Sequence, residues 1–198
     1  AGHYVIACGR NEQALAELTN IDSAHISGQK LDISNAQATV QALRAYTDID
    51  LVILAAGVCE YLDIDAFEAD LFARVFEVNV VGTMRCVEAL LPNLKSGSKL
   101  VIVGSTARLL PFTRAEAYGG SKAAIHYITR SLQVDLAPRG INVLHVSPGF
   151  VETPMTAQND FEMPMQVSVE FASQAIRRGI EKNKIDITFP RLFGWFLK

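Results

Sequence analysis

The stretch AYGGSKAAI, residues 117–125, places a phenol and an ammonium four positions apart, with two glycines and a serine between them. On a helix, positions i and i+4 share a face, so Tyr118 and Lys122 would project side by side. A tyrosine with a pKa of about 10 exchanges protons poorly at neutral pH, and a neighbouring cation favours its phenolate form. The pair therefore predicts a general acid and base. For an isolated YxxxK motif, the alternative is an exposed pair on an amphipathic helix.

Two polar residues upstream lie where a site of this kind needs them. Ser105 follows the apolar run VIVG, at the carboxyl end of a predicted strand, where ligands of open α/β sheets bind. Asn79 lies inside the apolar run FEVNVVGTM, and a polar side chain at such a position must find hydrogen-bond partners. A turn serine and an amide satisfied by the backbone are the alternatives that the residues alone leave open.

Short apolar runs alternate with longer segments of helical period, which is typical of repeated βαβ units and a parallel sheet covered on both faces. We expect strands at residues 4–8, 51–56, 99–104, 141–147 and 185–189, with a weaker one within 24–31. Helices are expected at residues 11–19, 35–45, 67–91, 115–137 and 168–182. Pro138 and Gly140 should end the fourth of these helices. We interpret residues 1–198 as a single α/β domain.

The composition fits a compact globular class, with 49% hydrophobic and 20% charged residues in 198. A net charge of −3 gives no reason to expect nucleic-acid binding, which needs a concentrated basic face. Cys8, Cys59 and Cys86 are widely spaced and form no CxxC pair, so we expect neither disulfides nor a metal site. No apolar run is long enough to span a bilayer. We therefore predict a soluble cytoplasmic protein.

Together with the segment SPGFVETPM, the set Asn79, Ser105, Tyr118 and Lys122 resembles the short-chain dehydrogenase/reductase superfamily. The order and spacing match the Asn-Ser-Tyr-Lys tetrad, the YxxxK motif and the PG motif of that family. Several independent matches over roughly one hundred residues are far more specific than one short motif. The resemblance implies a Rossmann-like, doubly wound parallel sheet with helices on both faces.

The resemblance also implies an activity and a role for each residue. The family transfers a hydride between a nicotinamide cofactor and a carbonyl or hydroxyl substrate. Tyr118 would move the proton, Ser105 would orient and polarise the substrate oxygen, and Lys122 would lower the pKa of Tyr118 and bind the nicotinamide ribose. Asn79 would hold a water relay behind the lysine. A non-catalytic dinucleotide-binding regulator with the same fold is the alternative, although such a protein needs no tuned phenol.

Further segments match the family's cofactor-binding positions. The resemblance implies contacts to the adenine from Asp32 and Ile33, to its ribose from Ala55, Ala56 and Gly57, and to the nicotinamide from Pro148, Gly149, Val151 and Thr153. Ala55 replaces the asparagine that is usual in the family. As alternatives, Asp32 is a helix cap and the glycines are turn residues.

The residue after the first predicted strand bears on the choice of cofactor. The family's NAD-dependent members place an acid there, but this chain has Gly9 and then Arg10. An arginine can pair bidentately with a phosphate and stack on an adenine. We therefore expect NADP(H) rather than NAD(H), with a solvated loop arginine as the alternative.

The family's first strand and its glycine-rich loop have no counterpart in these residues, so we expect an N-terminally incomplete domain. The absent strand would lie in the middle of the sheet, and its absence should expose two inner edges and apolar surface. Without the loop, whose N–H groups bind the pyrophosphate, dinucleotide affinity should be reduced.

The remaining expectations concern partners. We expect a small-molecule carbonyl or alcohol substrate beneath a lid at residues 153–164, with an apolar lining from Phe150, Met155, Phe161 and Met163. The resemblance implies a homodimer or homotetramer built on residues 67–91 and 115–137. The aromatic tail FPRLFGWFLK, residues 189–198, should pack on protein, and contact with a membrane surface is its alternative.

Overall fold

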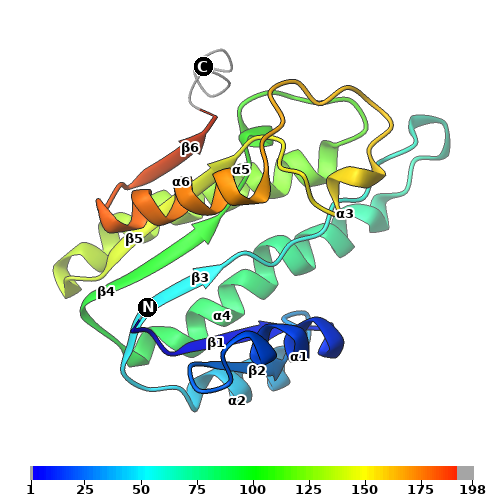
Figure 1. Cartoon of the computed structure of the whole chain (residues 1–198). Helices are drawn as coiled ribbons and strands as arrows, with labels where there is room; N and C mark the ends of the chain where they lie inside the picture. The colour runs from blue at the N-terminus through cyan, green and yellow to red at the C-terminus, as the bar shows by residue number, and fades with distance from the viewer. Residues whose placement is uncertain (1, 191–198) are drawn as a thin grey trace.

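The computed structural model describes residues 2–190 and has alternating strands and helices, as the sequence predicts (Figure 1). The strands are β1 (Val5–Gly9), β2 (Ile26–Lys30), β3 (Ile49–Leu54), β4 (Leu94–Val103), β5 (Asn142–Pro148) and β6 (Asp186–Phe189). The helices are α1 (Glu12–Ile21), α2 (Ala36–Arg44), α3 (Ala69–Phe76), α4 (Thr83–Leu90), α5 (Glu116–Leu136) and α6 (Val169–Glu181). The Rossmann-like α/β fold predicted from the sequence is confirmed.

All the strand pairs are parallel, and they form two sheets. Strands β3 to β6 lie in the order β3-β4-β5-β6, and β1 pairs only with β2. In the middle of the larger sheet, Leu100, Val101 and Ile102 are 1%, 0% and 1% exposed. This continuous burial explains why the strands read as unbroken apolar runs, since both faces of the sheet are covered.

The side chains of β4 and β5 alternate between two separate cores, one on each face of the larger sheet. Leu100, Ile102 and Val143 pack on one face with side chains from α2, α4 and α5. Val101 and Leu144 point the other way and pack with α6 and β6. Two covered faces are the defining property of a doubly wound sheet.

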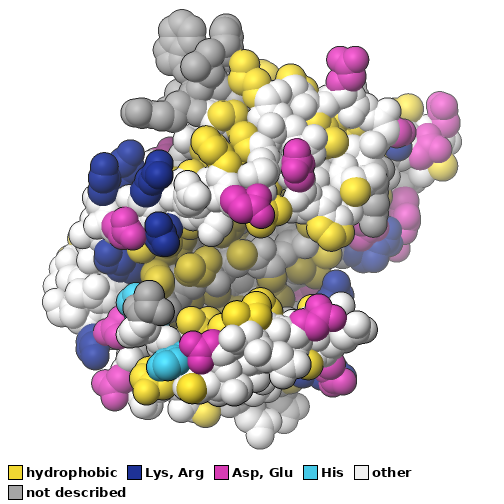
Figure 2. All heavy atoms as spheres, viewed as in Figure 1, with side chains coloured by type: hydrophobic (Ala, Val, Ile, Leu, Met, Phe, Trp, Pro, Cys, Tyr) yellow, Lys and Arg dark blue, Asp and Glu magenta, His cyan; other side chains and the backbone are white. Residues whose placement is uncertain are grey.

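The unpaired edges of β1 and β3 carry exposed apolar side chains. Val5 and Ile6 on β1 are 47% and 43% exposed, and Leu51 and Ile53 on β3 are 43% and 49% exposed. Figure 2 shows a hollow between the two parts of the molecule with hydrophobic side chains on its walls. This arrangement confirms the expected pair of inner edges. As a result, the strands form two separate sheets rather than one continuous sheet.

The helix expected over residues 67–91 is wrong in one respect, because it is not one regular α-helix. A π-helical turn over Glu77–Gly82 separates α3 from α4. The wide turn places Asn79 and Gly82 inward, where both are buried. Turns of this kind occur often at functional sites.

The alternative that Asp32 caps the second helix is also wrong. Asn35 is the cap of α2, and its side chain accepts the N–H of Ala38 at 3.0 Å. Asp32 instead accepts bonds from Ser34. In contrast, Gly140 ends the segment after α5 in a left-handed conformation, as predicted.

Most of the C-terminal tail, residues 191–198, lies outside the described residues, so its predicted packing is not tested. None of the helices within residues 2–190 combines the length and apolarity needed to cross a bilayer. In the same range, no three His, Cys, Asp or Glu side chains gather as metal ligands would.

Candidate active site

The catalytic candidates meet at the carboxyl ends of β3, β4 and β5, on the first turns of α5. Tyr118 and Lys122 lie one turn apart on α5, and the Lys122 Nζ atom is 5.6 Å from the centre of the Tyr118 ring. Tyr118 lies close enough to Ser105, which comes directly after Gly104 at the end of β4, for the serine hydroxyl to lower the pKa of the phenol. A phenol, an ammonium and a serine hydroxyl are therefore brought together from two elements.

Ser105 is also the N-cap of a short 3-10 turn, Thr106–Arg108. Its Oγ accepts the N–H of Ala107 at 3.1 Å, which leaves the hydroxyl proton available for Tyr118. The two sequence interpretations of Ser105, a cap and a site residue, are therefore both met in one side chain.

Asn79 is 1% exposed, and every polar atom of its amide has a partner. Its Oδ1 accepts the N–H of Val58 at 2.8 Å, and its Nδ2 donates to the Val58 carbonyl at 2.9 Å and to Ser121 Oγ at 2.9 Å. The amide thus links the loop after β3 to α5. The backbone-satisfied amide that the sequence left open is what the structure contains.

Gly57 brings the loop after β3 close to two of these residues. A Cβ atom at Gly57 would lie 3.2 Å from Asn79 Oδ1 and 3.3 Å from Lys122 Nζ. Any side chain there would therefore press on the amide and the ammonium. Ala55 and Ala56, just before it, are exposed and leave the end of β3 open.

Burial dominates the ionisation of both members of the YxxxK pair. Burial lowers the pKa of Lys122 to about 8. It also raises the pKa of Tyr118, while the hydrogen bond with Ser105 acts in the opposite direction. Desolvation of the phenolate is therefore the largest effect on the Tyr118 pKa, and the lowering by Lys122 that the family resemblance implies stays a prediction.

The residues predicted to hold the adenine lie at the carboxyl ends of β1 and β2. Arg10 is exposed, and it is close enough to Asp32 to act on its carboxylate. The pKa of Asp32 is lowered chiefly by the hydroxyl and backbone N–H of Ser34, and less by the Arg10 charge. Ile33 packs against Gly82, where a Cβ atom would lie 2.9 Å from its side chain.

Arg85 fixes this loop from α4 and was missed from the sequence. Its Nη1 donates to the carbonyl of Ser34 at 2.8 Å and pairs with Glu77. The Ser34 carbonyl lies 51 residues away along the chain, so no local motif predicts that contact. Arg85 thereby connects the small sheet to the helix that carries Asn79.

The segment after β5 is ordered by its own hydrogen bonds. Gly149 donates its N–H to the carbonyl of Phe189 at 2.8 Å, and Pro148 accepts the hydroxyl of Thr106 at 3.1 Å. The N–H of Thr153 is bound by Thr156 Oγ1 at 2.9 Å, and the same hydroxyl donates to the Val151 carbonyl. These contacts place residues 148–153 beside the Ser105 turn, as a common wall of the site.

Two residues near Tyr118 have no counterpart in the sequence interpretation. Cys59 and Tyr61 act on each other's ionisation, and Cys59 also acts electrostatically on Lys122 and Tyr118. The Tyr118 phenol in turn helps to raise the pKa of Tyr61. Tyr61 donates to Asn159 Oδ1 at 2.6 Å across 98 residues of sequence. Contacts of such separation leave no periodic signal.

From the segment expected to form the lid, Phe161 approaches Tyr61 and Phe150. The ring of Phe161 lies edge-on to Tyr61 and near Phe150, with both pairs of ring centroids 6.1 Å apart. Met155 and Phe161 are each 43% exposed. Phe161 therefore belongs to an apolar rim together with Tyr61 and Phe150, whereas the described contacts of Met163 are with Asn159.

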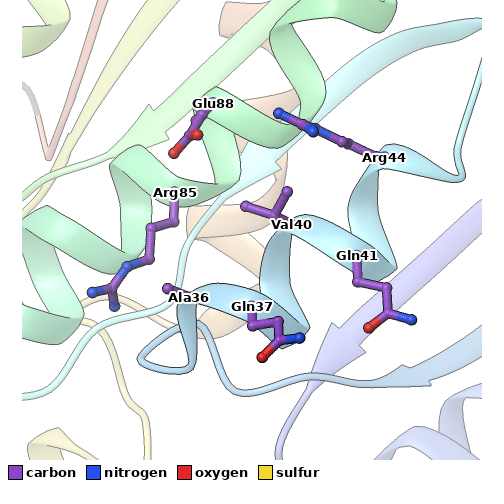
Figure 3. A pocket seen from close by; sticks show the side chains of 7 residues that line it. All are labelled: Ala36, Gln37, Val40, Gln41, Arg44, Arg85 and Glu88. Carbon is purple, nitrogen blue, oxygen red and sulfur yellow. The ribbon is translucent and has the colours of Figure 1, made fainter.

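A shallow pocket elsewhere on the surface lies between α2 and α4 and is distinct from this site (Figure 3). Its lining includes Gln37, Gln41 and Arg44 from α2, with Arg85 and Glu88 from α4. None of the tetrad residues lines it. We assign the chemistry to the strand ends, because the interacting phenol, ammonium and hydroxyl lie there.

This geometry and the parallel sheet define an α/β oxidoreductase of Rossmann type. Residues 1–163 match the family model described as short chain dehydrogenase. The chain therefore belongs to the short-chain dehydrogenase/reductase family. An uncharacterized oxidoreductase of Staphylococcus epidermidis is 30% identical over 181 residues, which cover 88% of this chain and 79% of the relative.

Solved structures agree with this assignment. The chain is similar to Pseudomonas aeruginosa RhlG in its NADP active-site complex, with 27% identity and a TM-score of 0.73 over 79% of this chain and 66% of that one. It is also similar in fold to a short-chain dehydrogenase from Sphingobium yanoikuyae in complex with NADPH, at 20% identity and a TM-score of 0.83. That match covers 96% of this chain and 79% of the other.

Proposed function

We propose that this chain is the catalytic part of an NADP(H)-dependent oxidoreductase that interconverts a carbonyl and an alcohol, with Tyr118 as general acid and base. The observation that carries the proposal is the meeting of three groups: the Ser105 hydroxyl is close enough to Tyr118 to lower its pKa, and the Lys122 Nζ atom is 5.6 Å from the Tyr118 ring centre. A buried phenol with a hydroxyl and an ammonium beside it is suited to proton transfer.

In the direction of reduction, the Tyr118 hydroxyl donates a proton to the substrate oxygen. Ser105 donates a hydrogen bond to the same oxygen and orients it, and it stabilises the phenolate that remains on Tyr118. The positive charge of Lys122 then lies beside that phenolate. Since the pKa of Lys122 is lowered to about 8, its charge is present at neutral pH and is lost in mildly alkaline solution.

The residues fit a nicotinamide dinucleotide, which supplies or accepts the hydride when it is bound. Lys122 is 5% exposed, and within the described residues its Nζ has one hydrogen-bond acceptor, the Val103 carbonyl at 3.3 Å. A buried ammonium with three donors needs further partners, and ribose hydroxyls would provide them. Because Gly57 has no side chain, the cofactor could approach the backbone closely at this position.

The remaining cofactor contacts are assigned by their place along the strand ends. Asp32 and Ile33 would contact the adenine, Ala55, Ala56 and Gly57 its ribose, and Pro148, Gly149, Val151 and Thr153 the nicotinamide. The preference for NADP(H) is supported by Arg10, which is exposed at the end of β1 where a 2′-phosphate would lie. The NADP(H) in the two solved relatives supports the same choice.

The apolar rim supports a small or medium-sized, largely uncharged substrate. Arg114, the nearest cation to the Tyr61 ring, is already paired with Asp160 at 3.0 Å. An anionic substrate would have to compete with that carboxylate. A homodimer or homotetramer and a cytoplasmic location are consistent with the family and remain predictions.

The decisive experiment compares the wild type with Tyr118→Phe on a panel of carbonyl compounds with NADPH. We expect turnover to fall by about 100- to 10,000-fold, the range that a general acid contributes. Nucleotide binding, measured by the fluorescence of NADPH, should be unchanged. Retained turnover would refute the role of Tyr118. Binding without turnover in the wild type on every substrate would favour the non-catalytic regulator.

A further inference from the structure

A buried polar cluster lies behind the turn that carries Ser105, and the proposed reaction does not use it. We call it the Arg108 cluster; it consists of Arg108, His126, His145, Ser147 and Asp186. His145 and Ser147 are completely buried in β5, and the Arg108 side chain is 8% exposed. A cluster of this polarity that is largely shielded from water is costly unless it has a structural or functional role.

The contacts of the cluster converge on Arg108. Its Nε donates to Ser147 Oγ at 3.0 Å, and its Nη2 donates to Asp186 Oδ2 at 3.3 Å. The Nδ1 atom of His145 is 3.1 Å from Ser147 Oγ and 3.8 Å from Asp186 Oδ1. The pKa of Asp186 is lowered to about 2, first by the hydrogen bond with His145 and also by the Arg108 charge. Asp186 therefore compensates the charge of Arg108.

The residue types resemble a Ser-His-Asp catalytic set, but the geometry excludes a relay. Ser147 and Asp186 both face the same ring nitrogen of His145, Nδ1, whereas a relay needs one partner on each nitrogen. Within the described residues, His145 Nε2 has no hydrogen-bond partner. The cluster therefore does not form a second active site.

The free side of the His145 ring lies against Gly104 instead. A Cβ atom at Gly104 would lie 2.4 Å from His145 Nε2, a distance that would force one group to move. The Gly104 N–H meanwhile donates to the Val146 carbonyl at 2.7 Å. The imidazole thus fills the space of a side chain at position 104, directly before Ser105.

On the other side of Ser105, two side chains hold the following turn to β5. The Thr106 hydroxyl donates to the Pro148 carbonyl, and the Arg108 guanidinium bridges Ser147 and Asp186. Ser105 is therefore fixed from both directions along the chain.

We propose that His145 and Arg108 are positioning residues for Ser105. The imidazole sets how closely the end of β4 approaches β5, and the guanidinium fixes the turn that follows. The inference rests on the proposed role of Ser105 as the hydrogen-bond partner of Tyr118. The inference predicts that a substitution at position 104, 145 or 108 changes the pKa of Tyr118, although Tyr118 itself is not substituted.

The test uses the steric conflict between Gly104 and His145 as a double-mutant cycle. Four variants are compared: Gly104→Ala, His145→Ala, the double variant, and Ser105→Ala as the reference for a lost hydrogen bond. Gly9→Ala is the matched glycine control, because a Cβ there would meet only Leu15, at 4.0 Å. The readout is the midpoint of Tyr118 ionisation, taken as the difference in ultraviolet absorbance between each protein and its Tyr118→Phe counterpart. This readout needs neither cofactor nor substrate.

We expect Ser105→Ala and Gly104→Ala to raise the Tyr118 midpoint in parallel, because the first removes and the second displaces the Ser105 hydroxyl, whose proximity lowers the pKa of Tyr118. The double variant should return toward the wild-type midpoint, and Gly9→Ala should not change it. Arg108→Lys, which cannot bridge both Ser147 and Asp186, should raise the midpoint by a smaller amount. If Gly104→Ala fails to fold, folding of the double variant supports the proposed contact.

Several results would overturn the inference. An unchanged midpoint in Gly104→Ala, or a double variant that is no closer to the wild type, removes His145 from the role. An unchanged midpoint in Arg108→Lys removes Arg108. If Ser105→Ala itself leaves the midpoint unchanged, the proposed function fails first, and the positioning inference falls with it.

Discussion

The two sheets of this molecule differ in packing and in the kind of residue that they present. The larger sheet, β3 to β6, has a core on both faces and positions Ser105, Tyr118 and Lys122. The smaller sheet, β1 and β2, keeps apolar side chains exposed along its free edge and presents the adenine candidates Arg10 and Asp32. The groups that would perform the chemistry thus lie at the sheet that is packed on both faces.

This difference has a physical reason. Proton transfer depends on hydrogen-bond distances, so its groups need a scaffold with few alternatives. Recognition of an adenine tolerates small displacements, because charge attraction and stacking vary slowly with distance. Arg85, from α4, joins the two halves at the backbone of Ile33 and Ser34. The comparison predicts that changes in the two halves will have different costs.

The largest effect should come from Lys122→Met, which separates catalysis from stability. Turnover should fall by about 100-fold or more, because the charge beside the phenolate is removed. Stability should rise at neutral pH, since the charged amine is disfavoured by burial. The measurements are steady-state kinetics and urea unfolding. A variant that loses both properties would show that Lys122 is mainly structural.

The pH dependence of the free energy of unfolding tests whether folding lowers the pKa of Lys122. The pKa of Lys122 is about 8 in the folded chain, against an ordinary lysine value of 10.5, so between these values the unfolded chain binds more protons. The free energy of unfolding of the wild type should therefore rise with pH over this window. It should not rise in Lys122→Met. Equal slopes in the two proteins would contradict the lowered pKa.

A matched pair of truncations compares the two halves directly. Val146 on β5 is 0% exposed and Val5 on β1 is 47% exposed. Val146→Ala should lower the free energy of unfolding by about 2 kcal/mol, through lost burial and a cavity. Val5→Ala should change it by less than about 0.5 kcal/mol, as is usual for exposed positions. Similar losses from chemical denaturation would mean that β1 is buried in solution.

A charge reversal at Arg10, at the end of β1 in the smaller sheet, tests the choice of cofactor. Arg10→Glu should raise the KM for NADPH by about 10-fold or more, the usual value of a charge-assisted hydrogen bond. The KM for NADH should change much less, because it lacks the 2′-phosphate. Arg44→Glu, on the outer end of α2, is the control for a general change in charge. Equal effects on both cofactors would leave Arg10 without a role in selection.

The smallest effect concerns the stability of the protein at acidic pH, through a histidine on α5 beside the larger sheet. Burial lowers the pKa of His126 to about 4, and the neighbouring Arg108, His145 and Arg130 also disfavour its charge, against Asp186. Between pH 6.5 and 4 the unfolded chain binds the proton first, so stability falls as the pH falls. His126→Gln should flatten this part of the stability profile. An unchanged acid slope would show that His126 is not buried in solution.

The sequence predicted the elements well because the central strands of the larger sheet, β4 and β5, are buried on both faces. That burial produces unbroken apolar runs such as residues 100–103, and the helices between the strands keep a clear period. The π-helical turn was missed, because its cause is tertiary: Asn79 is held by Val58 and Ser121, which are distant in sequence. Periodicity alone cannot register a contact of that kind.

The site was predicted less evenly than the fold. The spacing of Tyr118 and Lys122 predicts their proximity directly, because the two residues lie one helical turn apart. Tyr61, Arg85 and Arg108 were not predicted, because each acts through partners on other elements. The rise in the pKa of Tyr118 through burial was not predicted, since a sequence displays a charged neighbour but not the loss of water around the ring.

The π-helical turn at Glu77–Gly82 also determines how this region tolerates changes in length. It contains more residues per turn than the helices on either side, so its surplus residue is what rotates the Asn79 amide toward Val58. Deleting one residue there would let α3 and α4 merge into a single regular helix. The merged helix would have a more regular local geometry, but the Asn79 side chain would no longer face the loop after β3. Chain length at this point is therefore as much a part of the site as the identity of any side chain.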